Sequence, residues 1–464
     1  MGAVDSNARL RQLPSIDRVL KTEAARALRA KWLPRLVDDE VRALVDEWRA
    51  RLRESGGGEG AEPPRDPEAI AASAGERLAL RFAPGVVRCV NATGVVLHTG
   101  LGRAPLPRAA VDAIAREASG YCVVSVDREE GQRIRRESTL ARLLCALTGA
   151  EGATIVNNNA AATLLALHTM ASGREALISR GQLVEIGGSF RMPDVFAAAG
   201  VKLKEVGTTN RTHLADYARA VGPETALLLR VHPSNFRVVG FTHDVPLREL
   251  VALGREHNIP VMDDLGAGAL VPIPPEPELA ESVRLGADLL CCSGDKLIGG
   301  PQAGVLLGRA AIIDRVRRDP MFRALRVDKL TLAAMEATLR LFVRAEGPGD
   351  DLPTLRMLRI PPAALRRRAV ALARGIRRAA PAFAADVVPG ASQVGSGSLP
   401  GEDLPTTLVA LVRPDLSAAQ LARRLRLADP PVYARIVDDR VCLDPRTLLP
   451  GDDRRLFRVL EGIA

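Results

Sequence analysis

Cysteine is scarce in this sequence, and its spacing is not that of a metal site. Six cysteines are scattered over 464 residues, and none forms a CxxC pair. Several lie in apolar runs, which is typical of reduced, buried thiols in a cytosolic protein, so we expect no metal site. The six are Cys89, Cys122, Cys145, Cys291, Cys292 and Cys442.

Long apolar runs are also missing. No stretch approaches the roughly 20 residues that a membrane-spanning helix needs, and the first residues lack the apolar core of a signal peptide. We therefore expect a soluble, cytoplasmic protein with no membrane partner. The formal net charge of +9 favours an anionic partner, unless it reflects a general preference for arginine in the composition. Arginine is concentrated between residues 354 and 378, where eight occur without an acidic residue.

One lysine lies among small residues, and this setting favours a chemical role over a position on the solvated surface. Lys296 follows a predicted strand at residues 289–292 and lies between Gly294 and the pair at 299–300. Glycines let the backbone and a planar ligand approach closely, and desolvation lowers the pKa of an amine toward the range in which it is a nucleophile. We interpret Lys296 as the lysine that forms a Schiff base with pyridoxal 5'-phosphate.

This cofactor needs three further anchors, and three other predicted strands end in suitable side chains. Its ring nitrogen needs an acid, its phosphate needs the amides of a helix N-terminus, and its ring hydroxyl needs a donor. Carboxyl ends of parallel strands meet at one edge of a sheet, so these groups would share one crevice. The predicted cofactor-binding residues besides Lys296 are Asp264, Asn157, Asn158, Asn159, Ala160, Ser234 and Asn235.

Each of these residues also has a structural explanation. A lysine beside glycines can belong to a plain turn, an Asn-rich junction can be a helix cap, and a buried aspartate can be part of an ion pair. Asp263 directly precedes Asp264, and we choose the second because it comes directly before the Leu-Gly-Ala-Gly turn. The order of the four pieces along the chain favours the cofactor site.

Strand-like and helix-like stretches alternate through the middle of the chain, which predicts an α/β domain with a mostly parallel, doubly wound sheet. The N-terminal residues read as helical, and a glycine- and proline-rich linker follows at residues 55–67. We expect a helical N-terminal domain with its linker at 1–60, a catalytic α/β domain at 61–345 and an α+β domain at 346–464. The predicted strands are 153–156, 176–179, 201–206, 226–231, 260–263, 289–292 and 304–308.

Several longer motifs resemble the bacterial L-seryl-tRNA(Sec) selenium transferases, or selenocysteine synthases, a family of fold-type-I pyridoxal phosphate enzymes. The resemblance extends over nearly the whole chain. The matching segments are residues 10–17, 90–99, 101–106, 156–160, 179–191, 207–210, 234–236, 291–304, 323–332 and 395–400.

The resemblance implies an activity and several partners. The family converts L-seryl-tRNA(Sec) to L-selenocysteinyl-tRNA(Sec) with selenophosphate, through loss of the serine hydroxyl to a dehydroalanyl (aminoacrylate) intermediate. It implies that Arg103, Arg323 and Arg326 form an anion pocket at the active site, although the last two would otherwise read as a pair on a helix surface. It further implies a tRNA-recognising N-terminal domain, for which a dimer-contact or docking domain is the alternative, and a homo-oligomer built from dimers as a decamer-like ring.

Some roles stay open at this point. Asp295, beside the lysine, either steers protons or caps a turn. The general acid for loss of the hydroxyl is not identified, and Glu185, His98 and His232 are candidates. Two other functions compete: a pyridoxal phosphate enzyme that eliminates or replaces a β-substituent on a free amino acid, and an RNA-binding relative without chemistry.

Overall fold

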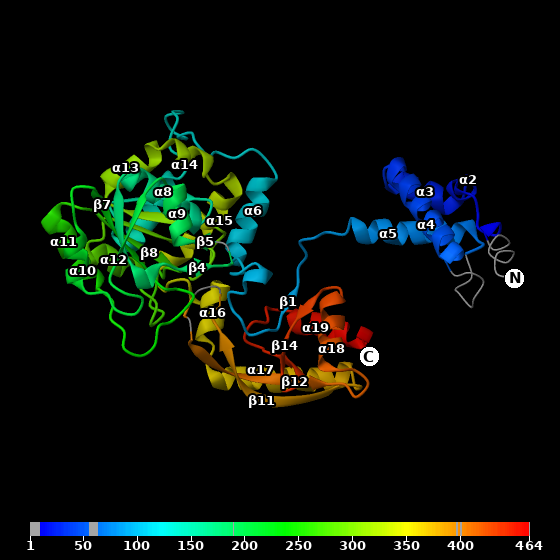
Figure 1. The fold of residues 1–464 in the computed structure, drawn as a ribbon. Helices are drawn as coiled ribbons and strands as arrows, with labels where there is room; N and C mark the ends of the chain where they lie inside the picture. Colours follow the sequence, from blue (N-terminus) through cyan, green and yellow to red (C-terminus); the bar gives the residue numbers. More distant parts are fainter. Residues whose placement is uncertain (1–9, 55–63, 189, 396–397, 400, 464) are drawn as a thin grey trace. The chain divides into compact units, whose positions relative to one another are not determined.

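The computed structural model describes residues 10–54, 64–188, 190–395, 398–399 and 401–463, and the chain divides into two units, Met1–Arg88 and Cys89–Ala464. Most of the predicted linker at 55–67 lies outside the described residues. The N-terminal unit is a helical bundle around one apolar cluster that includes Val19, Val41, Val45 and Leu78 (Figure 1). Its described helices are α2 (Ile16–Leu20), α3 (Glu23–Lys31), α4 (Pro34–Glu54) and α5 (Pro67–Arg81).

Helix α5 belongs to this bundle and not to the second unit. The sequence places the boundary after residue 60, whereas the structure places it after Arg88. The reason is the apolar face of α5, where Ile70, Ala74 and Leu78 are buried in the same cluster as α4. Arg77 adds a 2.7 Å ion pair with Glu47 of α4.

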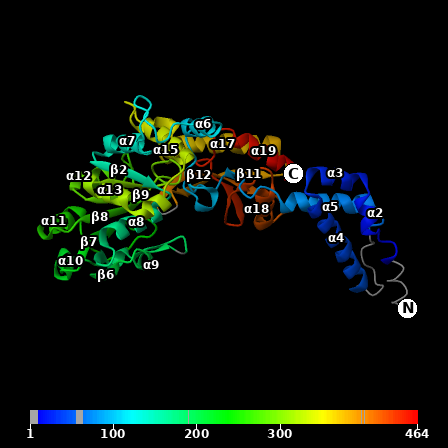
Figure 2. The same cartoon turned by 90° about the horizontal axis from the view of Figure 1, so that it is seen from above.

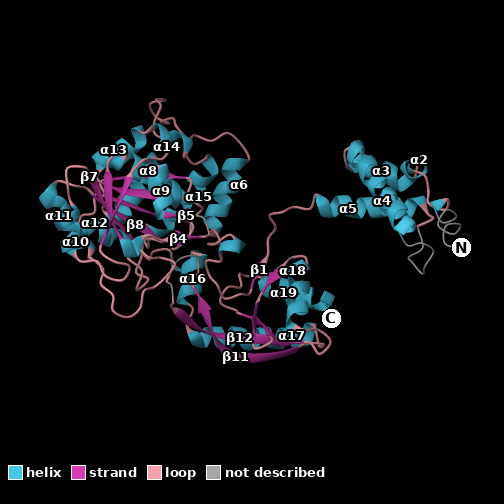
Figure 3. Cartoon of the chain, viewed as in Figure 1, coloured by secondary structure: helices cyan, strands magenta, loops and turns pink. Residues whose placement is uncertain are grey.

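The second unit is built on a seven-stranded sheet (Figure 3). Six strands run parallel, and only β10 is antiparallel to its neighbours β9 and β2. The mostly parallel sheet predicted from the alternation is therefore confirmed. In sheet order the strands are β2 (Gly152–Val156), β10 (Gly304–Gly308), β9 (Leu289–Ser293), β8 (Val261–Gly266), β7 (Thr225–Val231), β3 (Glu175–Ser179) and β6 (Lys202–Val206).

Helices cover both faces of this sheet, as Figure 2 shows from above. Successive residues of a strand point to opposite faces, so Leu290 and Cys292 pack in one apolar cluster while Leu289 and Cys291 pack in the other. The first face carries α7 (Ser138–Thr148), α10 (Leu214–Ala220), α11 (Leu247–His257), α12 (Leu279–Leu285) and α15 (Lys329–Phe342). The second carries α8 (Asn159–Ala171), α9 (Met192–Ala198), α13 (Ala310–Arg318) and α14 (Pro320–Ala324). Helix α6 (Arg108–Ala118) packs against α15.

The last part of the second unit has its own four-stranded antiparallel sheet, in the order β11-β12-β15-β14. Helices α17, α18 and α19 share an apolar cluster with it. Most of the arginines between residues 354 and 378 lie on the exposed side of α17. The elements are α16 (Pro353–Arg359), α17 (Pro362–Ala379), β11 (Ala384–Gln393), β12 (Asp403–Val412), α18 (Ala418–Leu427), β13 (Val432–Tyr433), β14 (Arg435–Val437), β15 (Arg440–Leu443) and α19 (Asp452–Ile463).

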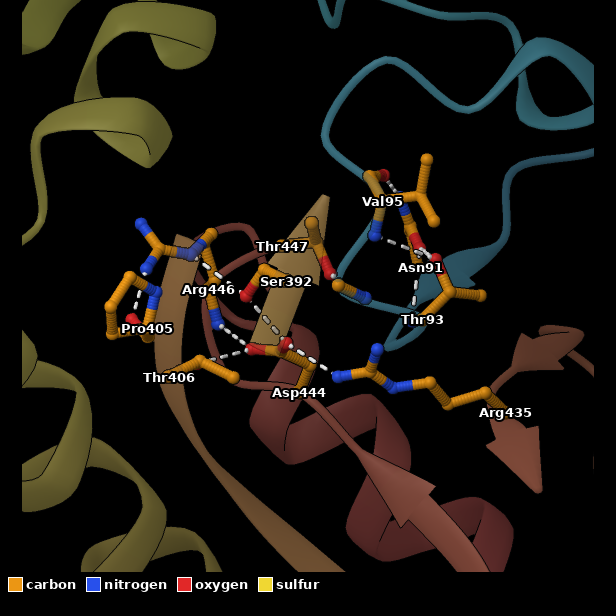
Figure 4. Close-up of polar contacts among 11 residues, drawn as sticks. Asn91, Thr93, Val95, Ser392, Pro405, Thr406, Arg435, Asp444, Arg446 and Thr447 are labelled. Atoms are coloured by element: carbon orange, nitrogen blue, oxygen red, sulfur yellow. Dashed lines mark hydrogen bonds and ion pairs between the residues drawn. The ribbon is translucent and has the colours of Figure 1, made fainter. Parts of the chain in front are cut away.

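A buried polar network joins this sheet to residues 91–95, which precede the large sheet in the chain (Figure 4). Asp444 is fully buried and accepts hydrogen bonds from Ser392 and Thr406 and an ion pair from Arg435. The buried Arg446 donates to the Ser392 hydroxyl and to two backbone carbonyls. A buried charge is costly unless it is paired, so the network holds β11, β12 and β15 in one arrangement.

Two hydrogen bonds connect the same network to residues 92 and 94. The Asp444 amide donates to Ala92, and Gly94 donates to the Thr447 hydroxyl. Gly94 has φ +78°, and a Cβ there would lie 2.1 Å from the Asp444 carboxylate, so a larger residue does not fit. Strand β1 (Val90–Asn91), which pairs with β13, leads into this contact.

Among the described residues, no helix combines the length and the apolar character needed to cross a membrane. Within the same part of the chain, no group of three His, Cys, Asp or Glu side chains is arranged to hold a metal ion.

Candidate active site

A pocket of about 260 Å³ lies at the carboxyl ends of four strands of the large sheet. Residues at or just after the carboxyl ends of β2, β7, β8 and β9 all contribute to it, as expected for a ligand site in an α/β sheet. Of the predicted residues, Lys296, Asp295, Arg103, Asp264, Asn158, Asn159, Ala160 and Ser234 line this pocket. It is also lined by Val184, Ile186, Gly187, Phe190, Val231, His232, Gly266, Ser293 and Gln302.

Lys296 is buried, with a relative exposure of 5%. Burial lowers the pKa of its amine, and the positive charge of Arg103 lowers it further, while Asp295, Asp264 and Glu276 oppose the shift. An amine with a lowered pKa is available as a nucleophile nearer neutral pH. The lysine therefore has the electrostatic environment that imine chemistry requires.

Asp295 connects the lysine to a distant loop. Its carboxylate forms a 2.7 Å ion pair with Arg103, and its backbone carbonyl accepts from Ala104. Arg103 has φ 61°, a left-handed conformation that is uncommon for a residue with a side chain. Such strain persists only where surrounding contacts hold it, and here the Arg103 amide donates to His98.

The two adjacent aspartates point to opposite faces of the sheet. Asp264 faces α8, where it accepts from the Asn159 side chain at 2.9 Å and from the Thr163 hydroxyl at 2.8 Å. Asp263 faces the other side and is paired with Arg230 at 2.9 Å and with Ser282 of α12. Burial raises the pKa of Asp263. Of the two, Asp264 lines the pocket and Asp263 does not.

The N-terminus of α8 opens into the pocket. Asn158 caps this 13-residue helix by accepting from the Ala161 amide, and Asn159 and Ala160 line the cavity. A helix N-terminus presents amide donors and a positive dipole end, which suits a phosphate group. Gly304 of β10 permits this arrangement, because a Cβ there would lie 2.1 Å from the Asn158 carbonyl.

Several polar atoms around the pocket are buried without a hydrogen-bond partner among the described residues: Asn159 Oδ1, His232 Nδ1 and Ser234 Oγ. Buried polar atoms are nearly always paired, so three such atoms at one cavity indicate a polar ligand. A pyridoxal phosphate molecule would present a ring nitrogen, a hydroxyl and a phosphate to Asp264, Ser234 and α8. The donor set, the lysine and the cavity therefore fit this cofactor.

Four predicted residues lie outside the pocket lining. Asn235 is exposed and its side chain donates to the Glu185 carbonyl at 2.7 Å. Asn157 is exposed, and its amide donates to Leu325, which places the turn containing Arg323 and Arg326 beside the start of α8. Both arginines are exposed.

These two arginines belong to a larger basic group. Burial lowers the pKa of Arg136, and so do the charges of Arg326, Arg133 and Arg323, while Glu137 opposes them. Arg136 donates to the Val327 carbonyl at 3.4 Å. Within one chain the three arginines predicted to act together are thus divided, with Arg103 in the pocket and the other two beside it.

Some residues that line the pocket or hold its side chains are not predicted from the sequence. Thr163 lies one helical turn after Asn159, so both reach Asp264 from the same face of α8; this i,i+4 spacing was a usable signal. Phe190 of the short hairpin β4 (Glu185–Ile186) and β5 (Phe190–Arg191) contributes an apolar wall. The glycines near Lys296 have another role than predicted: a Cβ at Gly294 would lie 2.4 Å from Met335 of α15.

Of the three candidate general acids, His232 is the one that lines the pocket. Burial lowers its pKa to about 4, and the charges of Arg230 and Lys296 contribute. It is therefore neutral at neutral pH and acts as a hydrogen-bonding group there. Glu185 is exposed and forms an ion pair with Arg191, and His98 adjoins the Arg103 loop.

Known proteins resemble this chain over most of its length. The family model described as L-seryl-tRNA selenium transferase matches residues 89–449. An L-seryl-tRNA(Sec) selenium transferase of Geotalea uraniireducens is 46% identical over 98% of this chain and 99% of its own length. The enzyme of the same name from Desulfomicrobium baculatum is 47% identical over 95% and 96% of the two chains.

Among solved structures, a D-glucosaminate-6-phosphate ammonia-lyase matches with a TM-score of 0.58 and 20% identity, covering 83% of this chain and 97% of that one. At this identity the match concerns the fold, and the predicted type-I fold is confirmed. The family predicted from the motifs is confirmed as well. The chain therefore belongs to the L-seryl-tRNA selenium transferase family.

Proposed function

We propose that this protein converts L-seryl-tRNA(Sec) to L-selenocysteinyl-tRNA(Sec) with pyridoxal 5'-phosphate as its cofactor and selenophosphate as the selenium donor. The observation that carries the proposal is the buried Lys296, in one pocket with Asp264 and the N-terminus of α8, in a chain of this family. The relatives' printed name supports the tRNA substrate.

The cofactor, when bound, supplies an electron sink that acidifies the serine Cα–H bond and permits loss of the β-hydroxyl. Lys296 would hold the cofactor, and its amine is placed to take the Cα proton. Asp264 would keep a proton on the ring nitrogen, and Asn159 and Thr163 fix the orientation of that carboxylate. The first amides of α8 would hold the phosphate, and Ser234 would serve the ring hydroxyl.

Selenophosphate is an anion, and arginine forks bind its oxygens in pairs. We assign this role to Arg103, and the exposed Arg323 and Arg326, in the turn beside the start of α8, add positive charge that attracts the anion. Asp295 holds the Arg103 guanidinium in place through the 2.7 Å ion pair. The neutral His232 offers a hydrogen bond to the departing hydroxyl.

We further propose that the N-terminal unit recognises the tRNA and that the protein acts in the cytoplasm as a homo-oligomer built from dimers. Its six cysteines are all free thiols, which suits a reducing compartment. Support for the oligomer comes from a groove of about 1110 Å³ on the second unit beside the exposed side chains of Tyr121 and Val123. Apolar side chains left in water at a groove are typical of subunit contacts.

The direct test supplies the purified holoenzyme with seryl-tRNA(Sec) and labelled selenophosphate. We expect selenocysteinyl-tRNA from the wild-type protein and none from Lys296→Ala. Borohydride reduction, digestion and mass spectrometry should locate the pyridoxyl group on Lys296, and Lys202→Ala, on the exposed edge strand β6, is the matched control. Turnover of a free amino acid with no product from the charged tRNA would instead favour a β-eliminating or β-replacing enzyme. Absence of any bound cofactor would favour a non-catalytic RNA-binding relative.

A further inference from the structure

One buried carboxylate near Lys296 has no part in the site described so far. Glu276 lies in the loop between β8 and α12 and has a relative exposure of 7%. Its Oε1 accepts a 2.6 Å hydrogen bond from the Leu399 amide. Its Oε2 is buried with no hydrogen-bond partner among the described residues. A buried carboxylate with one free oxygen requires an explanation.

The residue that Glu276 holds belongs to the wall behind the lysine. Leu399 and Val394 lie in one apolar cluster with Leu297, the direct neighbour of Lys296. The backbone of Leu97 donates to Val394, so this wall also borders the segment that leads to Arg103. Glu276 therefore connects the loop between β8 and α12 to the segment between β11 and β12, whose apolar side chains pack with Leu297.

The charged groups around Lys296 differ in how far they are already engaged. Asp295 is paired with Arg103, and Asp264 accepts from Asn159, Thr163 and the Gly266 amide. Glu276 is the remaining carboxylate that acts on the lysine. Among the described residues, His232 and the buried thiol of Cys292 also interact electrostatically with Lys296.

We propose that Glu276 is a positioning residue for the catalytic lysine: it fixes the wall behind Lys296 through its hydrogen bond to Leu399, and its carboxyl group balances the positive charge of Arg103 at the lysine amine. The proposal rests on the function assigned to Lys296 above. The physical reason is that the charge of Arg103 disfavours a protonated Lys296 amine, and the carboxylate of Glu276 counters this effect. Lys296 can then both hold a proton and release it during turnover.

The test measures the lysine itself in the cofactor-free protein. Lys296 is modified with an amine-reactive reagent at a series of pH values, and mass spectrometry of the digest gives the pH at which half of it reacts. In Glu276→Gln the amide oxygen still accepts from Leu399, but the charge is gone. We expect the midpoint to fall by about one pH unit, and the acidic limb of the pH profile of kcat/KM to move in the same direction.

Glu278→Gln is the matched control, because Glu278 is two residues away and does not act on Lys296. Its midpoint should equal that of the wild type. Glu276→Ala should lower the midpoint and also accelerate hydrogen exchange of the Leu399 amide. An unchanged midpoint in Glu276→Gln overturns the proposal. Because this readout needs neither tRNA nor selenium, it is independent of whether the proposed reaction is correct.

If Glu276→Gln is insoluble, the reciprocal variant measures the same coupling. Burial raises the pKa of Glu276, and the charge of Lys296 opposes this. In Lys296→Met the pKa of Glu276 should therefore rise further, and the free energy of unfolding should fall more steeply above pH about 4.5, the ordinary pKa of a glutamate. Equal slopes in the variant and the wild type would count against the coupling.

Discussion

The Arg103 guanidinium and the Asp295 carboxylate lie 2.7 Å apart, although 192 positions separate them in the chain. The pair joins the residue beside the reactive lysine to a loop that starts at the C-terminal sheet. Arg103 also carries the positive charge that most strongly opposes protonation of Lys296. One contact thus connects the proposed anion site with the nucleophile.

Replacing Arg103 by lysine keeps the charge and removes the planar fork. Lysine meets the same left-handed backbone cost, so stability should change little. We expect KM for selenophosphate to rise about tenfold, equivalent to ~1.4 kcal/mol, because a single ammonium group replaces a bidentate contact. Steady-state kinetics check this, with the exposed Arg108→Lys as control. An unchanged KM would place the anion elsewhere.

Substitutions of the two aspartates of β8 should have different effects, one on turnover and the other on stability. Asp264→Asn keeps the shape and loses the charge next to the ring nitrogen, so we expect kcat to fall about 100-fold or more, ~2.7 kcal/mol, with a normal melting temperature. Asp263→Asn weakens the pair with Arg230 and should cost ~1–3 kcal/mol of stability while the folded protein turns over normally. Exchanged effects would mean that the wrong aspartate has been assigned.

The lowered pKa of His232 predicts that the folded protein loses stability in acid. Its pKa falls from 6.5 to about 4 on folding, so the unfolded chain binds the proton more readily. The stability that the neutral ring provides is complete above pH about 6.5 and declines as the pH falls toward 4. Urea unfolding at several pH values should show a weaker decline in His232→Asn. The exposed His257→Asn, on α11, should keep the wild-type slope.

Asp444 should be a large contributor to the stability of the second unit. Asp444→Ala leaves Arg435 and the buried Arg446 without their carboxylate, and we expect a loss of ~3 kcal/mol. The exposed Asp403→Ala should change stability by less than about 0.5 kcal/mol. Both tryptophans, Trp32 and Trp48, lie in the N-terminal unit, so their fluorescence transition should not move. Circular dichroism should report the shift, and equal curves for the two variants would contradict the prediction.

The structure redefines the truncation that tests tRNA recognition. Deleting residues 1–60 would leave α5 without its bundle and expose Ile70 and Leu78, whereas deletion of 1–88 removes one complete unit. The shorter protein should keep the cofactor on Lys296 and lose most of its affinity for seryl-tRNA(Sec), measured by filter binding. Full affinity in the truncated protein would reject the recognition role.

Much of the large sheet was predictable because its strands are short apolar runs separated by helices, and Lys296 stands out among glycines. The position of Asp264 followed from its place before a turn. Other parts depend on tertiary contacts that a linear pattern does not contain. The membership of α5 in the first unit depends on packing against α4, and the role of Glu276 depends on an amide 123 positions away.

Arg323 and Arg326 illustrate the same limit. The motif associates them with the site, but local spacing reads equally well as a helix surface pair. Their position beside α8 comes from one backbone hydrogen bond, between Asn157 and Leu325, which no side-chain pattern reveals.

The opposed aspartates of β8 have a consequence for how this sequence can change. A shift of that strand by a single position toward its carboxyl end would bring Asp263 to the place that faces the cavity and turn Asp264 to the opposite face of the sheet. An insertion or deletion in the connection before β8 would therefore alter the chemistry of the pocket without replacing any residue in it.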